Sequence, residues 1–573
     1  MPPASLLQRL RRARGLLPGA AVLALAGAPA VADPAYDVLL RGGLVVDGTG
    51  AAPFVADVGV RGERIVLVGH APVDATARID RDVTGLVVTP GFIDLHTHAD
   101  EDVELAPFRT TPGMIRQGVT MAVFGVDGEA DPLAAREFRA RIARDGIGVN
   151  FMMYAGHNGI RTAVMGDAAR AATPDEVAKM CERVRIGMED GAIGLSTGLM
   201  YLPGRHATTD EVVALAKVAA QYGGRYDTHD RDPAGDMLGS IGEGFEIGRR
   251  AALEAHIAHL KAVGRRNFGH IDDMLALFRE AAKHGPVSAD IYPYDGATAR
   301  LAMEILVPPP DTKAAELAKA LEAPGMTSER RVALLADLQR EWRAILASPD
   351  ARRAARQITE SPPPQVYSWV TAVGYESFRV VSSARPELIG RMLVDVAADR
   401  HQSPFDVLAE LVETEGPTAK LTLGAVDEQE MRRLLAQPFT MLSSDGHEAG
   451  VEGGRGHPRY RGSFARVLAR YVRENPVLTL PQAVHKMSGQ SAQYLGLADR
   501  GVIRVGAYAD VGVFDAQKVT DRSTWDHPEL YAEGFRDVFV NGVAALLDGE
   551  TTGALAGRYV PYTAAPPRPE KSR

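Results

Sequence analysis

Two histidines near the start of the chain have the types and spacing of a metal-binding pair. The segment 90–98 runs Pro-Gly-Phe-Ile-Asp-Leu-His-Thr-His and ends with His96 and His98. Side chains two residues apart on a strand point to the same face, so the two imidazoles should face the same way. Imidazole nitrogens suit zinc, which lowers the pKa of a bound water towards about 7 and polarises carbonyl groups. Together with the Pro-Gly-Phe-Ile-Asp segment before it, the pair therefore predicts a site for a metal ion such as zinc.

Two more histidines stand at the ends of later strand-like runs. His229 closes the run 224–229, and His259 lies near the end of the run 255–260. The carboxyl ends of the strands of a parallel barrel meet at one face, so we expect all four histidines to converge on a metal centre. His256 has the opposite strand parity from His259 and is predicted to lie outside the ligand set.

A carboxylate follows the last of these runs. Asp445 comes two residues after the strand-like run 439–443. A carboxylate beside a metal centre can take a proton from water and pass it to a leaving amine. We therefore predict that Asp445 is the catalytic acid and base.

The elements that must position these residues follow an α/β rhythm. Between residues 89 and 497, short apolar runs alternate with helical patterns, as in a closed (β/α)8 TIM barrel. The strand candidates are 91–98, 120–125, 148–155, 191–197, 224–229, 255–260, 287–292 and 439–443. The segment 308–364, rich in Pro, Arg and Ala, breaks this rhythm and is predicted to be an insertion over the barrel mouth.

Both ends of the chain differ from this middle part. Residues 33–88 and 498–573 contain short β-rich runs separated by glycines, with Asn541-Gly542 as a hairpin signal. We expect the two flanks to form one small β-sandwich. Residues 1–32 have an arginine-rich start, a short apolar run and small residues before Asp33, which is typical of a signal peptide. The sequence thus predicts a secreted or periplasmic protein with no stable membrane insertion after cleavage.

The composition is that of a soluble globular protein. The 573 residues are 46% hydrophobic and 24% charged, and the net charge of -9 gives no basic surface for nucleic acid. The single cysteine, Cys181, cannot form an internal disulfide and is predicted to be a buried core thiol. The oligomeric state stays open.

Beyond the histidines, several motifs resemble the N-acyl-D-amino-acid deacylase (D-aminoacylase) family of the amidohydrolase superfamily. They are Gly156-His157-Asn158-Gly159-Ile160-Arg161, the run GAIGLSTGLMY at 191–201, His259-Leu260-Lys261, Tyr292-Pro293-Tyr294, His457-Pro458-Arg459, and the tail motifs at 499–501 and 506–510. The resemblance covers essentially all of the chain after residue 32. It implies one or two zinc ions and the hydrolysis of N-acyl-D-amino acids to a carboxylic acid and a free D-amino acid.

The resemblance also implies residues that bind the substrate. The free carboxylate of a small-molecule substrate should be held by Lys261, Tyr292, Thr298 and Arg459, and the family usually has Ser where this chain has Thr298. A guanidinium can bind a carboxylate with two parallel hydrogen bonds, which suits Arg459. His157 and Tyr201 are expected to line the acyl side.

One position departs from the family. D-aminoacylases usually carry a metal-binding Cys after the second strand, where this chain has Asp127 in the run Phe-Gly-Val-Asp-Gly at 124–128. A carboxylate can also bridge two metals, so we expect Asp127 to be the substitute ligand. Two alternatives are a turn Asp that caps the next helix and a carboxylated Lys261 that bridges the metals.

Other activities fit the same residues. A dipeptidase that cleaves before a C-terminal, possibly D, residue would use the same carboxylate-binding groups. A lactone or cyclic-amide hydrolase would not need Arg459, because its ring substrates have no free carboxylate. A non-catalytic binding protein is disfavoured, because the four histidines and Asp445 are all present.

Overall fold

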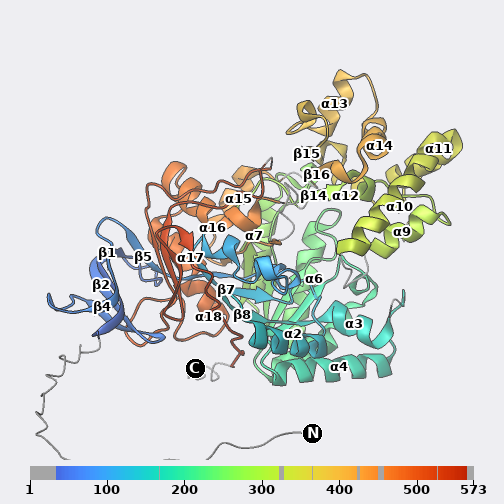
Figure 1. Ribbon diagram of the computed structural model, residues 1–573. Helices are drawn as coiled ribbons and strands as arrows, with labels where there is room; N and C mark the ends of the chain where they lie inside the picture. The colour runs from blue at the N-terminus through green and yellow to red at the C-terminus, as the bar shows by residue number, and fades with distance from the viewer. Residues whose placement is uncertain are drawn as a thin grey trace, which may run out of the picture.

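A computed structural model describes residues 34–166, 168–297, 299–321, 328–363, 366–422, 426–448, 457–525 and 527–563. The expected signal peptide (1–32) and Thr298 lie outside these residues. Figure 1 shows three parts: a β domain at the left, a central barrel with its helices, and a helical insertion at the upper right.

Parallel strands form the barrel. One sheet contains β6 (Phe92–Asp94), β7 (Val119–Phe124) and β8 (Asn150–Met153). The other contains β9 (Ala155–Gly156), β10 (Gly194–Gly198), β11 (Arg225–His229), β12 (Glu254–Ile257), β13 (Val287–Ile291) and β17 (Thr440–Leu442).

The two sheets continue into each other at both seams. The N–H of Ile193, just before β10, donates to the carbonyl of Met153 at 2.8 Å, and only Tyr154 separates β8 from β9. At the other seam the N–H of Asp445, after β17, donates to the carbonyl of His96, after β6, at 2.8 Å. With β8 and β9 counted as one bent strand, this is the predicted eight-stranded (β/α)8 barrel.

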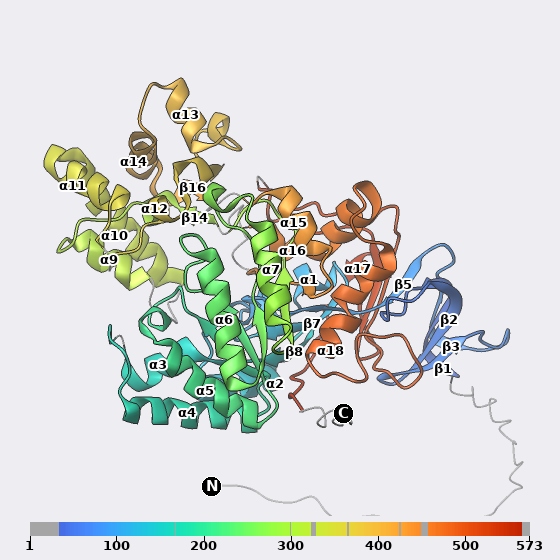
Figure 2. The ribbon, with the colours of Figure 1, turned by 180° about the vertical axis from the view of Figure 1, so that it is seen from behind.

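Helices surround the strands, as Figure 2 shows from behind. They are α1 (Pro112–Ile115), α2 (Pro132–Asp145), α3 (His157–Met165), α4 (Pro174–Glu189), α5 (Thr209–Gln221), α6 (Met237–Ala251), α7 (Ile271–Ala281), α15 (Glu428–Leu435), α16 (Arg459–Arg466), α17 (Leu480–Met487) and α18 (Gly489–Tyr494). Capping residues determine where several of these helices begin. Asp131 caps the N-terminus of α2 and Thr173 caps that of α4, and each is followed by a proline in the first turn. Within the described residues, no helix has the length and apolar character needed to cross a membrane.

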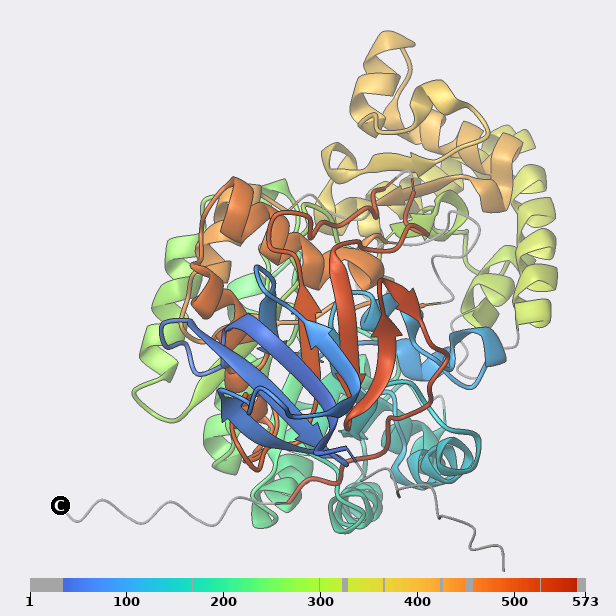
Figure 3. The ribbon, with the colours of Figure 1, turned by 60° about the vertical axis from the view of Figure 1, so that its left-hand side comes forward.

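Both ends of the chain combine in the β domain. Its strands are β1 (Tyr36–Val45), β2 (Phe54–Arg61), β3 (Arg64–Gly69), β4 (Ala77–Asp82), β5 (Val87–Pro90), β18 (Val511–Phe514), β19 (Phe535–Val540), β20 (Val543–Leu547) and β21 (Glu550–Thr551). Hydrogen bonds run through all of them as one sheet, in which β5 pairs antiparallel with β18 (Figure 3). A bulge between Leu40 and Gly43 bends β1, whose first half pairs with β4 and second half with β5, so the sheet curls around its own apolar core.

The insertion is larger than the sequence predicted. It extends beyond 308–364 and is built around a three-stranded sheet of β14 (Ala299–Leu301), β15 (Arg379–Ser382) and β16 (Lys420–Thr422). Its helices are α8 (Ala302–Ile305), α9 (Lys313–Leu321), α10 (Ser328–Ala347), α11 (Pro349–Glu360), α12 (Trp369–Val373), α13 (Leu393–Asp399) and α14 (Pro404–Glu415). Buried residues before and after position 364 pack in one hydrophobic core, so they belong to one insertion. The sequence composition identified only the first half of this insertion.

The insertion contacts loops at the carboxyl ends of barrel strands. Arg205, which follows β10, lies over the ring of Tyr367 at 4.8 Å. Arg266, which follows β12, donates to the carbonyl of Thr371. The insertion therefore lies on the face of the barrel where the predicted site residues gather.

Candidate active site

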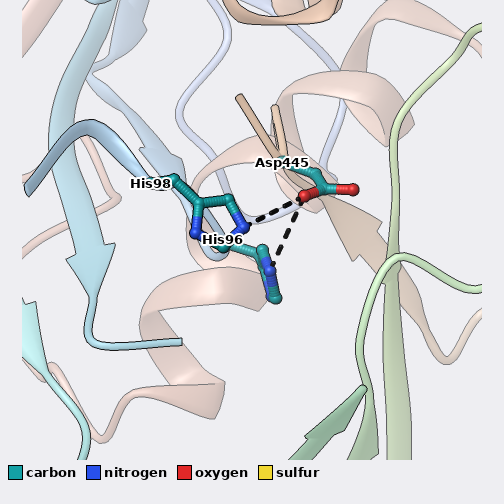
Figure 4. Close-up of side chains that lie close together, drawn as sticks. All are labelled: His96, His98 and Asp445. Atoms are coloured by element: carbon teal, nitrogen blue, oxygen red, sulfur yellow. Dashed lines mark ion pairs between the residues drawn. The ribbon is translucent and has the colours of Figure 1, made fainter. Parts of the chain in front are cut away.

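Six predicted residues come together at the carboxyl ends of four strands. His96 and His98 follow β6, Asp127 follows β7, His229 ends β11, His259 follows β12 and Asp445 follows β17. All six side chains are buried, with at most 8% of each residue exposed. Figure 4 shows His96 and His98 turned towards Asp445.

Asp127 lies among all four histidines. Its Oδ1 is 3.4 Å from His96 Nε2 and 3.6 Å from His259 Nε2. Its Oδ2 is 3.3 Å from His229 Nδ1 and 3.7 Å from His98 Nε2. A single carboxylate thus faces every imidazole of the group, as expected for a ligand shared by two metal positions.

The helix-capping alternative for Asp127 is not what the structure shows. Asp131 caps α2 instead, and its side chain accepts from the N–H groups of Leu133 and Ala134. Asp127 has a left-handed backbone, with φ of 52°, a conformation that non-glycine residues rarely adopt. This conformation turns its side chain into the barrel mouth.

Asp445 lies against the first histidine pair. Its Oδ1 is 3.4 Å from His98 Nε2 and 3.8 Å from His96 Nε2, as drawn in Figure 4. Its Oδ2 forms an ion pair with Arg459. Burial alone would raise the pKa of Asp445, but Arg459 and the neighbouring histidines hold that pKa well below its usual value. Asp445 is therefore a carboxylate that can accept a proton.

The donor atoms of this cluster fit divalent cations. Ligand atoms of His96, Asp127 and His259 lie within 4.8 Å of one another, and so do those of His96, His98 and Asp445. Among the described residues, His96 Nε2, Asp127 Oδ1 and His229 Nε2 are buried without a hydrogen-bond partner. Such atoms cost roughly 1–3 kcal/mol each when nothing binds them. Imidazoles with carboxylates are a donor set typical of zinc and similar metals.

Two cations and a tyrosine adjoin the cluster. Lys261 Nζ lies 4.8 Å from the centre of the Tyr292 ring, and the guanidinium carbon of Arg459 lies 4.6 Å from the same centre. The hydroxyl of Tyr292 is buried and has no hydrogen-bond partner in the described part of the chain. These three groups can bind an anion together.

The position of Lys261 bears on its proposed carboxylation. Its Nζ donates to the carbonyl of His259 at 2.6 Å and is 3.1 Å from His259 Nδ1. Because His259 Nε2 faces Asp127, Lys261 lies on the far side of that ring. This geometry favours Asp127 as the group shared between the histidines.

Two expected acyl-side residues lie in different surroundings. The Tyr201 hydroxyl is 3.3 Å from His229 Nδ1, so Tyr201 adjoins the cluster. His157 Nε2 instead contacts Glu211 at 3.0 Å, and Glu211 also binds Arg161. The recorded contacts of His157 are thus those of a packing residue, and its place beside the acyl group stays a prediction.

Sequence reasoning missed an acidic group beside His98. Glu129 Oε2 is 3.5 Å from His98 Nδ1. The ring of His447 stacks on that of His98 at 4.9 Å, and its Nδ1 is 3.5 Å from Glu101 Oε2. Glu101 ends a single 3-10 turn (Ala99–Glu101) and Glu129 lies in an irregular loop, so no periodicity points to either residue. Their only signal is that each closely follows a predicted ligand.

Comparisons with known proteins agree with this geometry. Residues 81–545 match the amidohydrolase family. A D-aminoacylase of Alcaligenes xylosoxydans xylosoxydans is 34% identical, over 92% of this chain and 98% of that protein. A solved D-aminoacylase structure, from work on its binuclear metal centre, is 33% identical with a TM-score of 0.69, covering 91% of this chain and 99% of the other. N-acyl-D-glutamate deacylase from Bordetella bronchiseptica, complexed with zinc and a phosphonate inhibitor, is 29% identical with a TM-score of 0.69, covering 92% and 99%.

Proposed function

The chain belongs to the amidohydrolase family, and we propose that it is a zinc-dependent hydrolase of N-acyl-D-amino acids. The products are a carboxylic acid and a free D-amino acid. One observation carries this proposal: Lys261, Tyr292 and Arg459 form an anion-binding group directly beside the cluster of histidines and Asp445. The D configuration is supported by the D-aminoacylase and the N-acyl-D-glutamate deacylase to which the chain is similar.

The buried cluster would hold one or two zinc ions. His96, His98 and Asp445 supply one set of ligand atoms, and His229 with His259 supply a second. Asp127 lies between the two sets. Bound zinc supplies an acidic water and polarises the carbonyl of the scissile amide.

The residues of the chain orient the substrate. The guanidinium of Arg459 binds the substrate carboxylate, with the Lys261 ammonium and the Tyr292 hydroxyl beside it. Because Arg459 also contacts Asp445, a carboxylate held by Arg459 has its amide bond close to Asp445. The substrate carboxylate thereby takes over part of the hydrogen bonding that Arg459 offers to Asp445.

Asp445 moves the proton. As a carboxylate it accepts a proton from the attacking water and then donates it to the leaving nitrogen. The net reaction breaks the C–N bond and forms a C–O bond, and the released acid transfers its proton to the amine. General acid–base catalysis of this kind contributes roughly 10²–10⁴-fold to the rate.

The acidic group beside His98 favours a second candidate, a dipeptidase. Glu129 contacts His98 from the side that faces away from Asp445. Arg459 contacts Asp445 and Lys261 contacts His259, whereas Glu129 contacts His98, so we expect the acyl part of a substrate to extend towards Glu129 and Glu101. A free ammonium on that acyl part, as in a dipeptide, would meet these carboxylates.

The remaining candidates are less well supported. Lactones and cyclic amides have no free carboxylate for the two cations at Tyr292. A non-catalytic protein has no need for four buried histidines around Asp127 and next to an ionised Asp445.

We also propose that residues 1–32 are a signal peptide and that the mature enzyme is periplasmic or secreted. The arginine-rich start, the apolar run and the small residues before Asp33 support this proposal. Expression of the whole chain in a bacterium, followed by fractionation and N-terminal sequencing, tests it. A cytoplasmic protein with an intact N-terminus would overturn it.

A substrate panel tests the catalytic proposal. Zinc-loaded protein is incubated with N-acetyl-D-amino acids, their L enantiomers, and dipeptides ending in D or L residues, and the products are followed by mass spectrometry. Asp445→Asn is the matched control, since it keeps the shape and removes the base. We expect cleavage of N-acetyl-D-amino acids that falls by roughly 10²–10⁴-fold in D445N. Cleavage of dipeptides alone would transfer the assignment to the second candidate.

A further inference from the structure

A chain of polar side chains runs through the barrel below the histidine cluster. His256 Nε2 is 2.8 Å from Asp290 Oδ2, and His256 Nδ1 is 2.9 Å from Ser288 Oγ. Ser288 Oγ donates to Glu254 at 3.0 Å. The interior of such a barrel is usually filled by branched apolar side chains, so a buried polar chain there calls for an explanation.

The hydrogen bonds fix the protons on His256. Ser288 has one hydrogen, which it gives to Glu254, so its oxygen must accept from His256 Nδ1–H. Asp290 Oδ1 accepts from the N–H of His259 at 3.0 Å and from the hydroxyl of Ser443, as expected of a carboxylate. Its Oδ2 therefore accepts from His256 Nε2–H. With hydrogen on both nitrogens, His256 is an imidazolium.

The electrostatics agree with this assignment. Burial favours the neutral imidazole, but the Asp290 carboxylate raises the pKa of His256 above its usual value. His256 is 1% exposed and Asp290 is fully buried, so neither charge has water as a substitute partner.

Asp290 connects this charge to the site. It holds the N–H of His259, whose φ of 37° is left-handed and disfavoured by roughly 1–2 kcal/mol. It also holds Ser443, two residues before Asp445. Ligand atoms of Asp290, Asp227 and His96 lie within 4.8 Å of one another. One carboxylate thus touches or adjoins three of the strand ends that carry the cluster.

We propose that His256 is a positioning residue of the metal centre. As a buried imidazolium it pairs with Asp290 and holds it in place, and Asp290 then sets the backbone of His259 and the end of β17. This role rests on the proposed metal centre and is independent of which acyl-amino acid is cleaved. It explains why a histidine of the wrong parity for ligation stands three residues before His259.

The test measures zinc affinity rather than turnover. The variants are His256→Gln, which can still donate to Asp290 but carries no charge, His256→Leu, which can do neither, and Asp290→Asn. Ser288→Ala is the matched control, because it breaks the chain on the side away from the cluster. Each variant is dialysed against a series of chelator concentrations, and the zinc bound per chain is measured by elemental mass spectrometry. The melting temperature of the metal-free protein is measured in excess chelator.

We expect H256Q and D290N to lose roughly 10–100-fold in zinc affinity, as for other partners of metal-binding histidines, while S288A binds like the wild type. The zinc affinity of H256L should fall further than that of H256Q. The double variant H256Q/D290N should lose no more than D290N, because both act through one bond. The melting temperature without metal should change little in H256Q.

Wild-type zinc affinity in H256Q and D290N would overturn the proposal. So would a loss in S288A as large as in H256Q, because packing would then be the cause. If H256L does not fold, the comparison of H256Q with S288A still decides. A wild-type protein that binds zinc but cleaves no acyl-amino acid would refute the proposed function alone, and the zinc comparison would still hold.

Discussion

Arg459 and Asp445 form a buried ion pair at the edge of the histidine cluster. Arg459 also lies over the ring of Tyr292, 4.6 Å from its centre. We therefore expect the substrate carboxylate to share this arginine with Asp445. Substrate binding should then weaken the hold of Arg459 on Asp445 and make this proposed base more basic.

Replacing Arg459 tests this sharing. Arg459→Ala removes a charge-assisted hydrogen bond to the substrate, so we expect kcat/KM for N-acetyl-D-amino acids to fall by about 10–100-fold. Arg459→Lys keeps the charge but loses the bidentate geometry. Its kcat/KM should therefore lie between the values of the wild type and of Arg459→Ala. Steady-state kinetics on each acid and on its primary amide supplies the control. An equal loss on the amide, which has no carboxylate, would contradict carboxylate binding.

Asp127 decides the metal stoichiometry. It faces His96, His98, His229 and His259 at 3.3 to 3.7 Å, so Asp127→Ala should reduce bound zinc by about one ion per chain. Asp127→Cys supplies a thiolate and should retain zinc. Metal analysis after dialysis measures both. Wild-type zinc content in D127A would mean that the carboxylate is not a ligand.

The acidic group beside His98 should select the acyl part. Glu129→Gln, alone and with Glu101→Gln, removes carboxylates that are about half exposed. We expect dipeptide cleavage to fall by up to about fivefold per residue, with N-acetyl substrates unaffected. The effect should shrink at high salt. Equal losses on both substrate types would show that Glu129 acts through His98 and not on the substrate.

His157 should matter for stability. It is fully buried against Glu211, which also binds the buried Arg161. Arg161→Met leaves the buried Glu211 carboxylate with His157 as its remaining side-chain partner in the described part of the chain, and should cost about 3–5 kcal/mol of unfolding free energy, measured in urea. His157→Gln should be less stable with an unchanged KM. A raised KM for long acyl chains at unchanged stability would instead support the expected acyl-side role.

Lys486 should make stability depend on pH. It lies on α17, is 5% exposed, and donates to the carbonyls of Gln437 and Thr440 before and within β17. Burial lowers the pKa of Lys486 to about 8. Between pH 8 and the usual lysine pKa, Lys486 is protonated in the unfolded chain and mostly neutral in the folded chain. The free energy of unfolding therefore rises with pH over this range, by an amount on the order of 3 kcal/mol.

The comparison with Lys486→Met isolates this contribution. Below pH 8 the cost of burying the ammonium is fully present in the wild type. From pH 8 to 10 the wild type should gain unfolding free energy relative to K486M. Urea unfolding at several pH values measures the difference, and a constant difference would show that Lys486 does not titrate in this range.

Strand periodicity and the order of strands explain what the sequence could predict. Strand periodicity was enough to predict His96 and His98 as a pair and to set His256 apart from His259, although His96, His98 and His259 lie just beyond the ends of β6 and β12. The convergence of His229, His259 and Asp445 follows from the rule that the carboxyl ends of barrel strands meet at one face.

The rest depends on contacts that local sequence does not encode. Glu129 and His447 approach His98 from two irregular loops more than 300 residues apart, and neither loop has a pattern that fixes its path. The second half of the insertion has an ordinary composition, and only its shared core with α10 assigns it to that unit. Arg459 was expected to bind the substrate carboxylate, and the identity of its partner Asp445 appears only when the first residue of α16 lies beside the loop after β17.

The pairing of β5 with β18 has a consequence for synthesis. Val88 pairs with Val513, and the N–H of Gly91 donates to the carbonyl of Asp510 at 2.8 Å, one residue before β6. The strand that presents His96 and His98 is thus fastened by a segment translated more than 400 residues later. At about 5–20 residues per second, a ribosome needs on the order of half a minute to cover that distance. Throughout that interval the segment that leads into the first two imidazoles lacks its β18 partner, so this side of the active centre is completed only after the last strands of the β domain are synthesised.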